Sequence, residues 1–273
     1  TALARLEPLP AIVDGLRMEA RRRLATALAE GAAAAAREHA LRAAIAMRER
    51  RFAPTHPEVA YDLNAYALHL KTQDRVGEAE AALRRVAEIL ARAHGETSLK
   101  HGYALANLAG AIARAGRYED SDATMARAID IAFAAQAPAT KRIELLAVRG
   151  DVLRVAGKPR DALKLFDEAI AIAATLQGVS FSTKLTLQGA AAAALLDIGE
   201  TKEAERLMGF LLDGPPPLTH EDEAMLNVVR LHASVAAARR DDAEAALALA
   251  RQAGESGRRI GSRESGCVEA WAT

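Results

Sequence analysis

Residues 105–128 read LANLAGAIARAGRYEDSDATMARA, two alanine-rich stretches on either side of Gly116. The same arrangement returns about every forty-two residues along the chain. The residues at the equivalent turns are Gly31, Asp74, Gly116, Gly157, Gly199 and Arg240, and they are separated by 43, 42, 41, 42 and 41 residues. A period in this range is typical of stacked helical hairpins that bury their apolar faces against one another. The sequence therefore predicts an all-α solenoid of about six hairpins.

Small and large residues recur at fixed distances from each turn. Five positions after it, every unit has a small residue: Ala36, Ala79, Ser121, Ala162, Ala204 and Ala245. Seven positions before it stand Leu24, Ala67, Ala109, Gly150, Ala192 and Ala233, of which five are small. Nine positions after it stand Ala40, Leu83, Met125, Phe166, Met208 and Leu249, of which five are large. Small residues on facing helices permit close approach, and we expect the large ones to fill the space toward the next hairpin.

This register predicts twelve helices in six hairpins. The expected pairs are 12–29 and 32–51, 57–73 and 76–94, 99–115 and 118–135, 140–156 and 159–177, 182–198 and 201–213, and 220–238 and 241–254. Thr55 is expected to cap the third of these helices. The array occupies residues 1–255, in units near 12–54, 55–97, 98–138, 139–179, 180–219 and 220–255. Residues 256–273 are expected to form a tail or a truncated or capping helix.

The small-small-large pattern around a glycine turn resembles the tetratricopeptide repeat. The long period and the sequence HPEVA at 56–60 resemble the kinesin-light-chain variety of that family. The best matches run from His56 to Gly95 and from Leu105 to Ala128, whereas the first and sixth units match poorly. Those outer units are either capping repeats or weaker matches without a special role. The resemblance covers residues 12–255 and implies a right-handed superhelix whose first helices line a concave face.

The resemblance also implies which first-helix residues face a peptide-binding groove. Transferred by the register, they include Arg21, Tyr61, Asn64, Lys71, Tyr103, Asn107, Arg114, Asp151, Arg154 and Arg230. Asparagine can pair with the backbone of an extended segment, and tyrosine offers a flat apolar face with a polar tip. Because cations outnumber carboxylates in this set, we expect an acidic ligand. The alternative is an ordinary solvated surface, or structural bonds between hairpins in the case of Asn64 and Asn107.

No motif in the chain predicts catalysis, a metal or a cofactor. The seven histidines form no His-Glu-x-x-His pair, and the single cysteine, Cys267, excludes a multi-cysteine metal site. Gly157–Lys158 lacks the first glycine of a phosphate-binding loop, and Pro159 stands where that motif has Ser or Thr. Ser180 and Ser182 have no glycine elbow around them. We therefore expect no enzyme activity and no cofactor.

The bulk composition favours a helical fold and gives no sign of nucleic-acid or membrane binding. Lys plus Arg and Asp plus Glu both number 36, so nothing in the charge balance favours nucleic acid or a membrane surface. Aromatic residues are only 4% of a chain that is 51% hydrophobic, which suits close helix packing. We expect a cytoplasmic location. Trp271, the one tryptophan, lies where a further repeat would begin, so the end of the chain is a truncated repeat, a cap or a disordered terminus.

The sequence thus predicts a non-enzymatic repeat domain that recognises a protein or peptide and acts as an adaptor or scaffold. One alternative is a regulatory or sensor segment of a larger bacterial signalling protein whose effector is a Ser/Thr kinase, an NTPase or a protease. Another is a self-assembling scaffold, in which the end repeats of two copies pack together.

Overall fold

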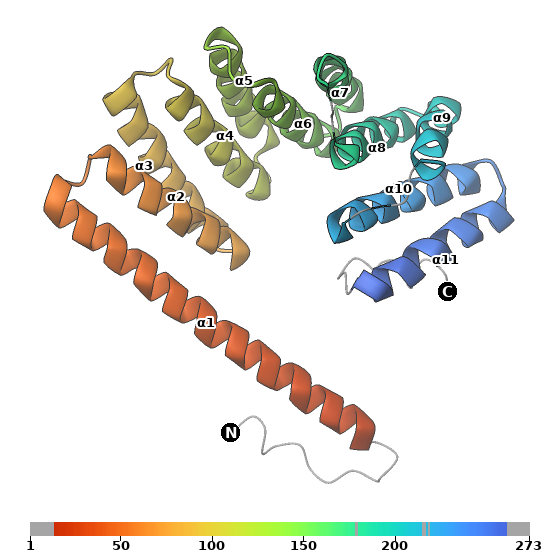
Figure 1. Ribbon diagram of the computed structural model, residues 1–273, viewed down its shortest axis with the longest axis horizontal. Helices are drawn as coiled ribbons and strands as arrows, with labels where there is room; N and C mark the ends of the chain where they lie inside the picture. The colour runs from red at the N-terminus through yellow and green to blue at the C-terminus, as the bar shows by residue number, and fades with distance from the viewer. Residues whose placement is uncertain (1–13, 178–179, 215–216, 218, 261–273) are drawn as a thin grey trace. The chain divides into compact units, whose positions relative to one another are not determined.

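The computed structural model describes residues 14–260 apart from 178–179, 215–216 and 218, and for residues 14–30, 221, 259 and 260 it describes the backbone alone. The helices are α1 (Asp14–Phe52), α2 (Pro57–Thr72), α3 (Val76–His94), α4 (Leu99–Arg114), α5 (Tyr118–Ala134), α6 (Ala139–Val155), α7 (Pro159–Ala174), α8 (Phe181–Asp197), α9 (Thr201–Leu212), α10 (His220–Arg239) and α11 (Ala243–Ile260) (Figure 1). No strand occurs among the described residues. The predicted all-α class is therefore confirmed. The chain divides into two compact units, Thr1–Ala93 and His94–Thr273.

The predicted first hairpin is wrong, because α1 is a single helix of 39 residues that runs straight through Gly31. Gly31 is not among the residues with positive φ, and a Cβ placed on it would meet no neighbour within 4 Å. Ala36 and Ala40, which the register places in the core, are exposed. The run of alanines at 32–36 explains the continuity, since alanine has the best helix propensity and offsets the cost of one glycine. Five hairpins therefore follow α1 in the described chain.

The five hairpin turns share one backbone geometry. Asp74, Gly116, Gly157, Gly199 and Asp241 have φ values of 56°, 77°, 75°, 87° and 60°. In each case the next residue donates its N–H to a carbonyl five residues back, and these acceptors are Leu70, Ile112, Leu153, Leu195 and Ala237, at 2.9 to 3.2 Å. This is the Schellman arrangement that ends helices with a left-handed residue. Four of the predicted turn residues are thus confirmed.

In the last hairpin the predicted turn residue is wrong by one position. Arg240 is the C-cap of α10, and Asp241 takes the left-handed conformation. A short polar side chain tolerates that conformation better than arginine does. Two other boundaries also differ from the prediction. His56 rather than Thr55 caps α2, accepting the N–H of Glu58 on Nδ1 at 3.2 Å, and α11 continues past residue 254 to Ile260.

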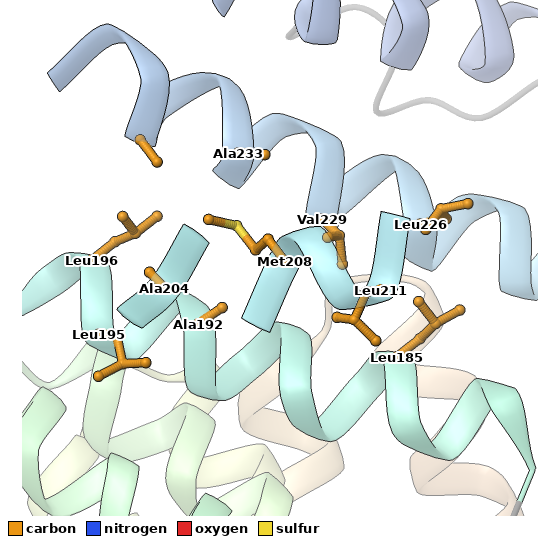
Figure 2. Packing of buried hydrophobic residues seen from close by; sticks show 11 residues of the cluster. Leu185, Ala192, Leu195, Leu196, Ala204, Met208, Leu211, Leu226, Val229 and Ala233 are labelled. Carbon is orange, nitrogen blue, oxygen red and sulfur yellow. The ribbon is translucent and has the colours of Figure 1, made fainter. Parts of the chain in front are cut away.

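The small-small-large register is confirmed in the four hairpins from α2 to α9. Ala79, Ser121, Ala162 and Ala204 are all 0% exposed, as are Ala67, Ala109 and Ala192 on the facing helices. The large residues Leu83, Met125, Phe166 and Met208 are at most 2% exposed. The Ser121 hydroxyl donates to the Ala109 carbonyl at 2.8 Å, so this buried polar group is satisfied. Figure 2 shows the resulting core where side chains of α8, α9 and α10 meet.

One hairpin uses a variant of this packing. Gly150 takes the small position on α6, and Phe166, the bulkiest residue at the large position, faces it from α7. A Cβ on Gly150 would lie 2.5 Å from Cε1 of the phenyl ring. Because Gly150 has no side chain, there is space on α6 that the ring of Phe166 on α7 fills.

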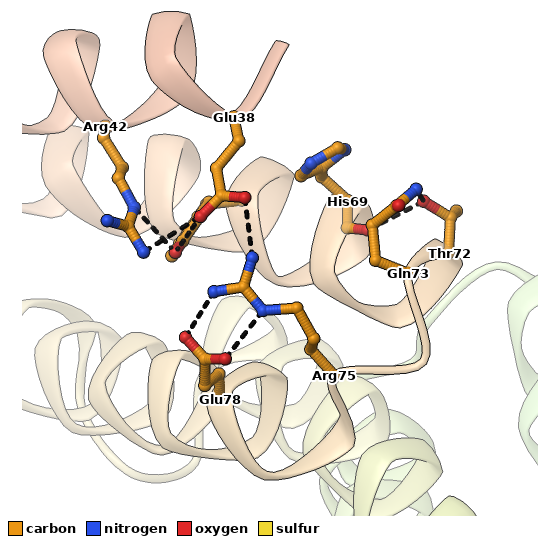
Figure 3. Close-up of polar contacts among 8 residues, drawn as sticks. Glu38, Arg42, His69, Thr72, Gln73, Arg75 and Glu78 are labelled. Carbon is orange, nitrogen blue, oxygen red and sulfur yellow. Dashed lines mark hydrogen bonds and ion pairs between the residues drawn. The ribbon is translucent and has the colours of Figure 1, made fainter. Parts of the chain in front are cut away.

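In the first unit, polar contacts attach α1 to the following hairpin (Figure 3). The Arg75 guanidinium donates to Glu38 of α1 at 2.6 Å and to both carboxylate oxygens of Glu78, at 2.6 and 2.7 Å. Arg75 holds the pKa values of both glutamates below their ordinary range, mainly through these hydrogen bonds. Further along α1, Arg48 lies 2.6 Å from Asp62 of α2. The part of α1 that contacts the hairpin is thus held by charge as well as by packing.

Candidate functional site

Apart from Arg21, which lies on α1, the predicted groove residues lie on first helices of the hairpins, and these first helices are α2, α4, α6, α8 and α10. In the second unit α6 contacts α8 and α8 contacts α10, so these first helices lie next to one another. On α6 the residues exposed from position 144 onward are Glu144, Val148, Asp151 and Val155. Their spacing of i, i+4, i+7 and i+11 places them on one face of the helix. The rest of α6 after Glu144 is buried or half-buried, so this stripe is the part of that stretch that a partner can reach.

A cleft of about 720 Å³ lies beside this stripe, between α6 and α8. Its apolar lining consists of Ile143, Ala147, Val148, Leu176 and Leu187. Hydroxyl groups come from Thr140, Ser180, Ser182, Thr183 and Thr186, and the remaining lining residues are Gln177, Glu144 and Asp151. The cleft therefore combines an apolar surface with hydroxyl groups and two carboxylates.

Local sequence explains why the hydroxyl groups gather at this end of α8. Ser180 is the N-cap of α8, and its Oγ accepts the N–H of Thr183 at 3.1 Å. Ser180 and Thr183 also share a hydrogen bond between their hydroxyls at 2.8 Å. Thr186 follows one turn later and donates to the Ser182 carbonyl at 3.0 Å. A cap followed by one helical turn thus fixes three of the five hydroxyl groups.

The two carboxylates of the cleft differ in their surroundings. Glu144 is paired with Lys141 at 2.5 Å, and the two side chains are 57% and 50% exposed, respectively. Asp151 forms no ion pair and no hydrogen bond with any residue that the structure describes. Water reaches part of Asp151, but protein atoms crowd its carboxyl enough that burial raises its pKa, while Arg154 opposes the shift. Asp151 is therefore the carboxylate of the cleft that lacks a partner.

Two of the predicted cations are engaged within the fold. Arg154 donates to Asp197 of α8 at 3.1 Å and so links two neighbouring first helices. Arg230 contacts Glu223 at 3.1 Å and the Asn227 side chain at 2.6 Å. Asn227 in turn donates to Ser256 of α11, which is 1% exposed. The Arg230 network is thus part of the packing between α10 and α11.

The other predicted residues are distributed over both units. Tyr103, Asn107 and Arg114 follow one face of α4 at i, i+4 and i+11, and the latter two are exposed. In the first unit, Tyr61 is 47% exposed on α2, with Asn64 and Lys71 half-buried on the same helix. Arg21 lies in the part of α1 where the backbone alone is described. Of the ten predicted residues, Asp151 is the one that lines the cleft.

The hydroxyl side of the cleft is the feature that sequence reasoning missed. Thr186 stands thirteen positions before Gly199, the offset at which Tyr103 precedes Gly116 and Glu144 precedes Gly157. Extending the register of first-helix residues to the hairpin of α8 and α9 would have found it. Trp271 and Cys267 lie outside the described residues.

A membrane-spanning helix and a metal-binding cluster are both absent from the described residues. None of its helices has both the length and the apolar character that crossing a membrane requires. Among the same residues, no three His, Cys, Asp or Glu side chains gather in a way that would hold a metal ion.

Comparison with known proteins identifies the fold. No protein-family model and no curated protein sequence matches the chain. BtubC (BKLC) from P. vanneervenii is similar in structure, with a TM-score of 0.69 and 14% identity over 84% of this chain and 92% of that one. A Podosopora anserina putative kinesin light chain with nearly identical TPR-like repeats has a TM-score of 0.64 and 18% identity, over 76% of this chain and 98% of that one. The quorum sensor NprR from B. thuringiensis has a TM-score of 0.59 and 13% identity, over 74% of this chain and 55% of that one.

At these identities the similarity establishes the fold. The chain is an all-α array of tetratricopeptide-type hairpins. More particularly, its fold is similar to that of kinesin-light-chain repeats, as the long period and the HPEVA sequence at 56–60 predict.

Proposed function

We propose that this chain is a non-enzymatic protein-interaction domain that acts as an adaptor or scaffold. It binds an extended segment of a partner protein along the first helices of the second unit, with the cleft between α6 and α8 as the main contact. The observation that carries this proposal is the stripe on α6. Val148 and Val155 are 38% and 57% exposed on a helix that is otherwise largely buried, and Val148 lines the cleft. Exposed apolar side chains beside a cleft are typical of a binding surface.

The lining suits a peptide segment. Backbone N–H and C=O groups of an extended chain need polar partners when they leave water, and threonine and serine hydroxyls can donate or accept. The apolar lining offers a place for one or two side chains of the segment. A few side chains seated in such pockets usually carry most of the binding energy of an interface. The hydroxyls at the amino-terminal turns of α8 and the valines of α6 thus supply the two kinds of contact that a peptide requires.

A selection experiment with matched variants tests this proposal. A phage-displayed library of random nonapeptides is selected on the full chain, and the affinities of the enriched peptides are measured by titration. Val148→Gln replaces the apolar contact in the cleft by an uncharged amide, and we expect it to weaken binding about ten-fold or more whatever the charge of the peptide. Leu247→Gln is the control, because Leu247 is also 38% exposed but lies on α11, outside the cleft.

The outcome is clear because both substitutions are at exposed positions that should preserve helicity. Circular dichroism of each variant checks this. Peptides that bind the Val148→Gln variant as tightly as the parent would contradict the proposal, as would equal losses in the Leu247→Gln variant. Light scattering of the free chain separates this function from a self-assembling scaffold, which would show oligomers across the concentration range.

A further inference from the structure

We infer that the cleft between α6 and α8 receives a lysine or arginine side chain of the partner segment, and that Asp151 is the group that recognises it. This inference rests on the proposed function and reverses the charge that the sequence predicts for the ligand. It names the chemistry of the partner: an extended segment in which a cation is accompanied by apolar residues.

The charges that line the cleft have one sign. Glu144 and Asp151 are acidic, and the lining contains no lysine, arginine or histidine. The neighbouring cations on α6 already have partners, since Lys141 pairs with Glu144 and Arg154 pairs with Asp197. An acidic segment would therefore meet two carboxylates without an available cation in the lining, whereas a basic segment meets complementary charge.

Asp151 is the carboxylate best placed to use that charge. No described residue forms an ion pair with it, and burial raises its pKa by more than the nearby charge of Arg154 lowers it, so its ionised form is only partly compensated in the free protein. An ammonium or guanidinium group from a partner would supply this compensation through a charge-assisted hydrogen bond. Asp151 lies on the same stripe as Val148, one turn away, so one segment can meet both side chains.

The apolar lining agrees with a long cationic side chain. Lysine and arginine bury their methylene stems along apolar surface while the charged head stays near a polar partner. Ala147, Val148 and Leu187 provide such a surface within the same cleft that Asp151 lines. The hydroxyls of Thr183 and Thr186 remain for the backbone of the segment.

Parallel selections test the inference. The random nonapeptide library is selected on the full chain and on its Asp151→Asn, Asp151→Lys and Asp130→Asn variants, and the ratio of Lys and Arg to Asp and Glu in the bound peptides is compared with the input. Asp130 is an exposed acid on α5, outside the cleft, and serves as the control. We expect basic residues to be enriched on the parent chain and on the Asp130→Asn variant. The enrichment should be lost with Asp151→Asn and should turn to acidic residues with Asp151→Lys.

A synthetic peptide makes the test quantitative. In the enriched peptide, the lysine is replaced by norleucine, which keeps the stem and removes the charge. On the parent chain this replacement should weaken binding about ten-fold or more, whereas on the Asp151→Asn variant it should have little further effect. A loss of the same size on both chains would mean that the lysine contacts another group.

The results distinguish the failure of this inference from the failure of the proposed function. If Val148→Gln weakens binding but the parent enriches acidic or neutral peptides, or Asp151→Asn keeps the basic preference, the charge inference is wrong and the proposed function stands. If the selected peptides bind the Val148→Gln variant as tightly as the parent, the cleft is not the site and both are wrong. A selection that enriches no peptide counts against both.

Discussion

Replacing Gly150 with alanine tests the packing of the repeat at its tightest point. The new Cβ would lie 2.5, 2.7 and 3.0 Å from Cε1, Cζ and Cδ1 of Phe166. These distances are well inside van der Waals contact, and the ring is 0% exposed, so it has no open space to move into. Overpacking of this kind costs about 1–3 kcal/mol, whereas the gain in helix propensity is about 1 kcal/mol. With the overpacking cost near its upper limit, we expect a net loss of about 2 kcal/mol.

A second substitution should restore the stability. In two other hairpins alanine occupies the small position and methionine the large one, namely Ala109 with Met125 and Ala192 with Met208. Gly150→Ala combined with Phe166→Met reproduces that pairing. We expect Phe166→Met alone to lose about 1–2 kcal/mol through the smaller side chain, and the double variant to recover most of both losses, with a favourable coupling of about 2–3 kcal/mol.

Thermal and urea unfolding of the four proteins measures the cycle. A loss of about 2 kcal/mol corresponds to a fall in Tm of about 4–8 °C for a chain of this size. Gly209→Ala is the matched control, because Gly209 is helical and a Cβ there meets nothing within 4 Å. It should leave stability unchanged or raise it by up to about 1 kcal/mol. If Gly150→Ala is as stable as this control, or if the two losses simply add, the reasoning is refuted.

Three further substitutions have expected outcomes. Asp241→Gly should raise the free energy of unfolding by about 0.5–1 kcal/mol, because φ is 60° there and glycine adopts that conformation without strain; a lower Tm would contradict this. Asp151→Asn should stabilise the free protein at pH 7. Burial raises the pKa of this carboxyl in the folded state, so the parent loses stability as pH rises through that pKa. The stability advantage of the variant should therefore vanish below about pH 4. An advantage that persists in acid would contradict the account. Arg75→Gln should loosen α1, and amide hydrogen exchange in residues 31–52 should speed up, whereas Arg84→Gln, which removes an exposed pair within α3, should leave that exchange unchanged.

The turns and the packing register were predictable because they rest on local chemistry. Glycine at 116, 157 and 199 ends each first helix in the left-handed conformation, and the small residues five positions later are all buried. The predicted turn at Gly31 was wrong, because a glycine next to a run of alanines leaves the helix intact. The predicted turn at Arg240 was also wrong, since the periodic pattern tolerates a shift of one residue and backbone strain selects Asp241.

The candidate site was less predictable than the fold. The stripe on α6 follows from the register, and Asp151 was found in this way. The pairing of Arg154 with Asp197 and of Arg230 with Glu223 joins residues 43 and 7 positions apart, and counting charges at the predicted groove positions alone overlooks it. The charge available to a ligand depends on these pairs, which is why the count of groove residues predicted an acidic partner and the lining of the cleft favours a basic one.

Site-specific photo-crosslinking tests the central claim most directly. A benzophenone amino acid is placed at position 148 of the full chain, or at position 247 as the control, and each protein is irradiated with the peptide that the selection enriches. The account predicts a covalent adduct at position 148 and none at position 247, with the peptide's basic residue next to the crosslinked one in the fragment spectrum. Equal adducts at both positions, or an adduct at position 247 alone, would contradict a binding site between α6 and α8.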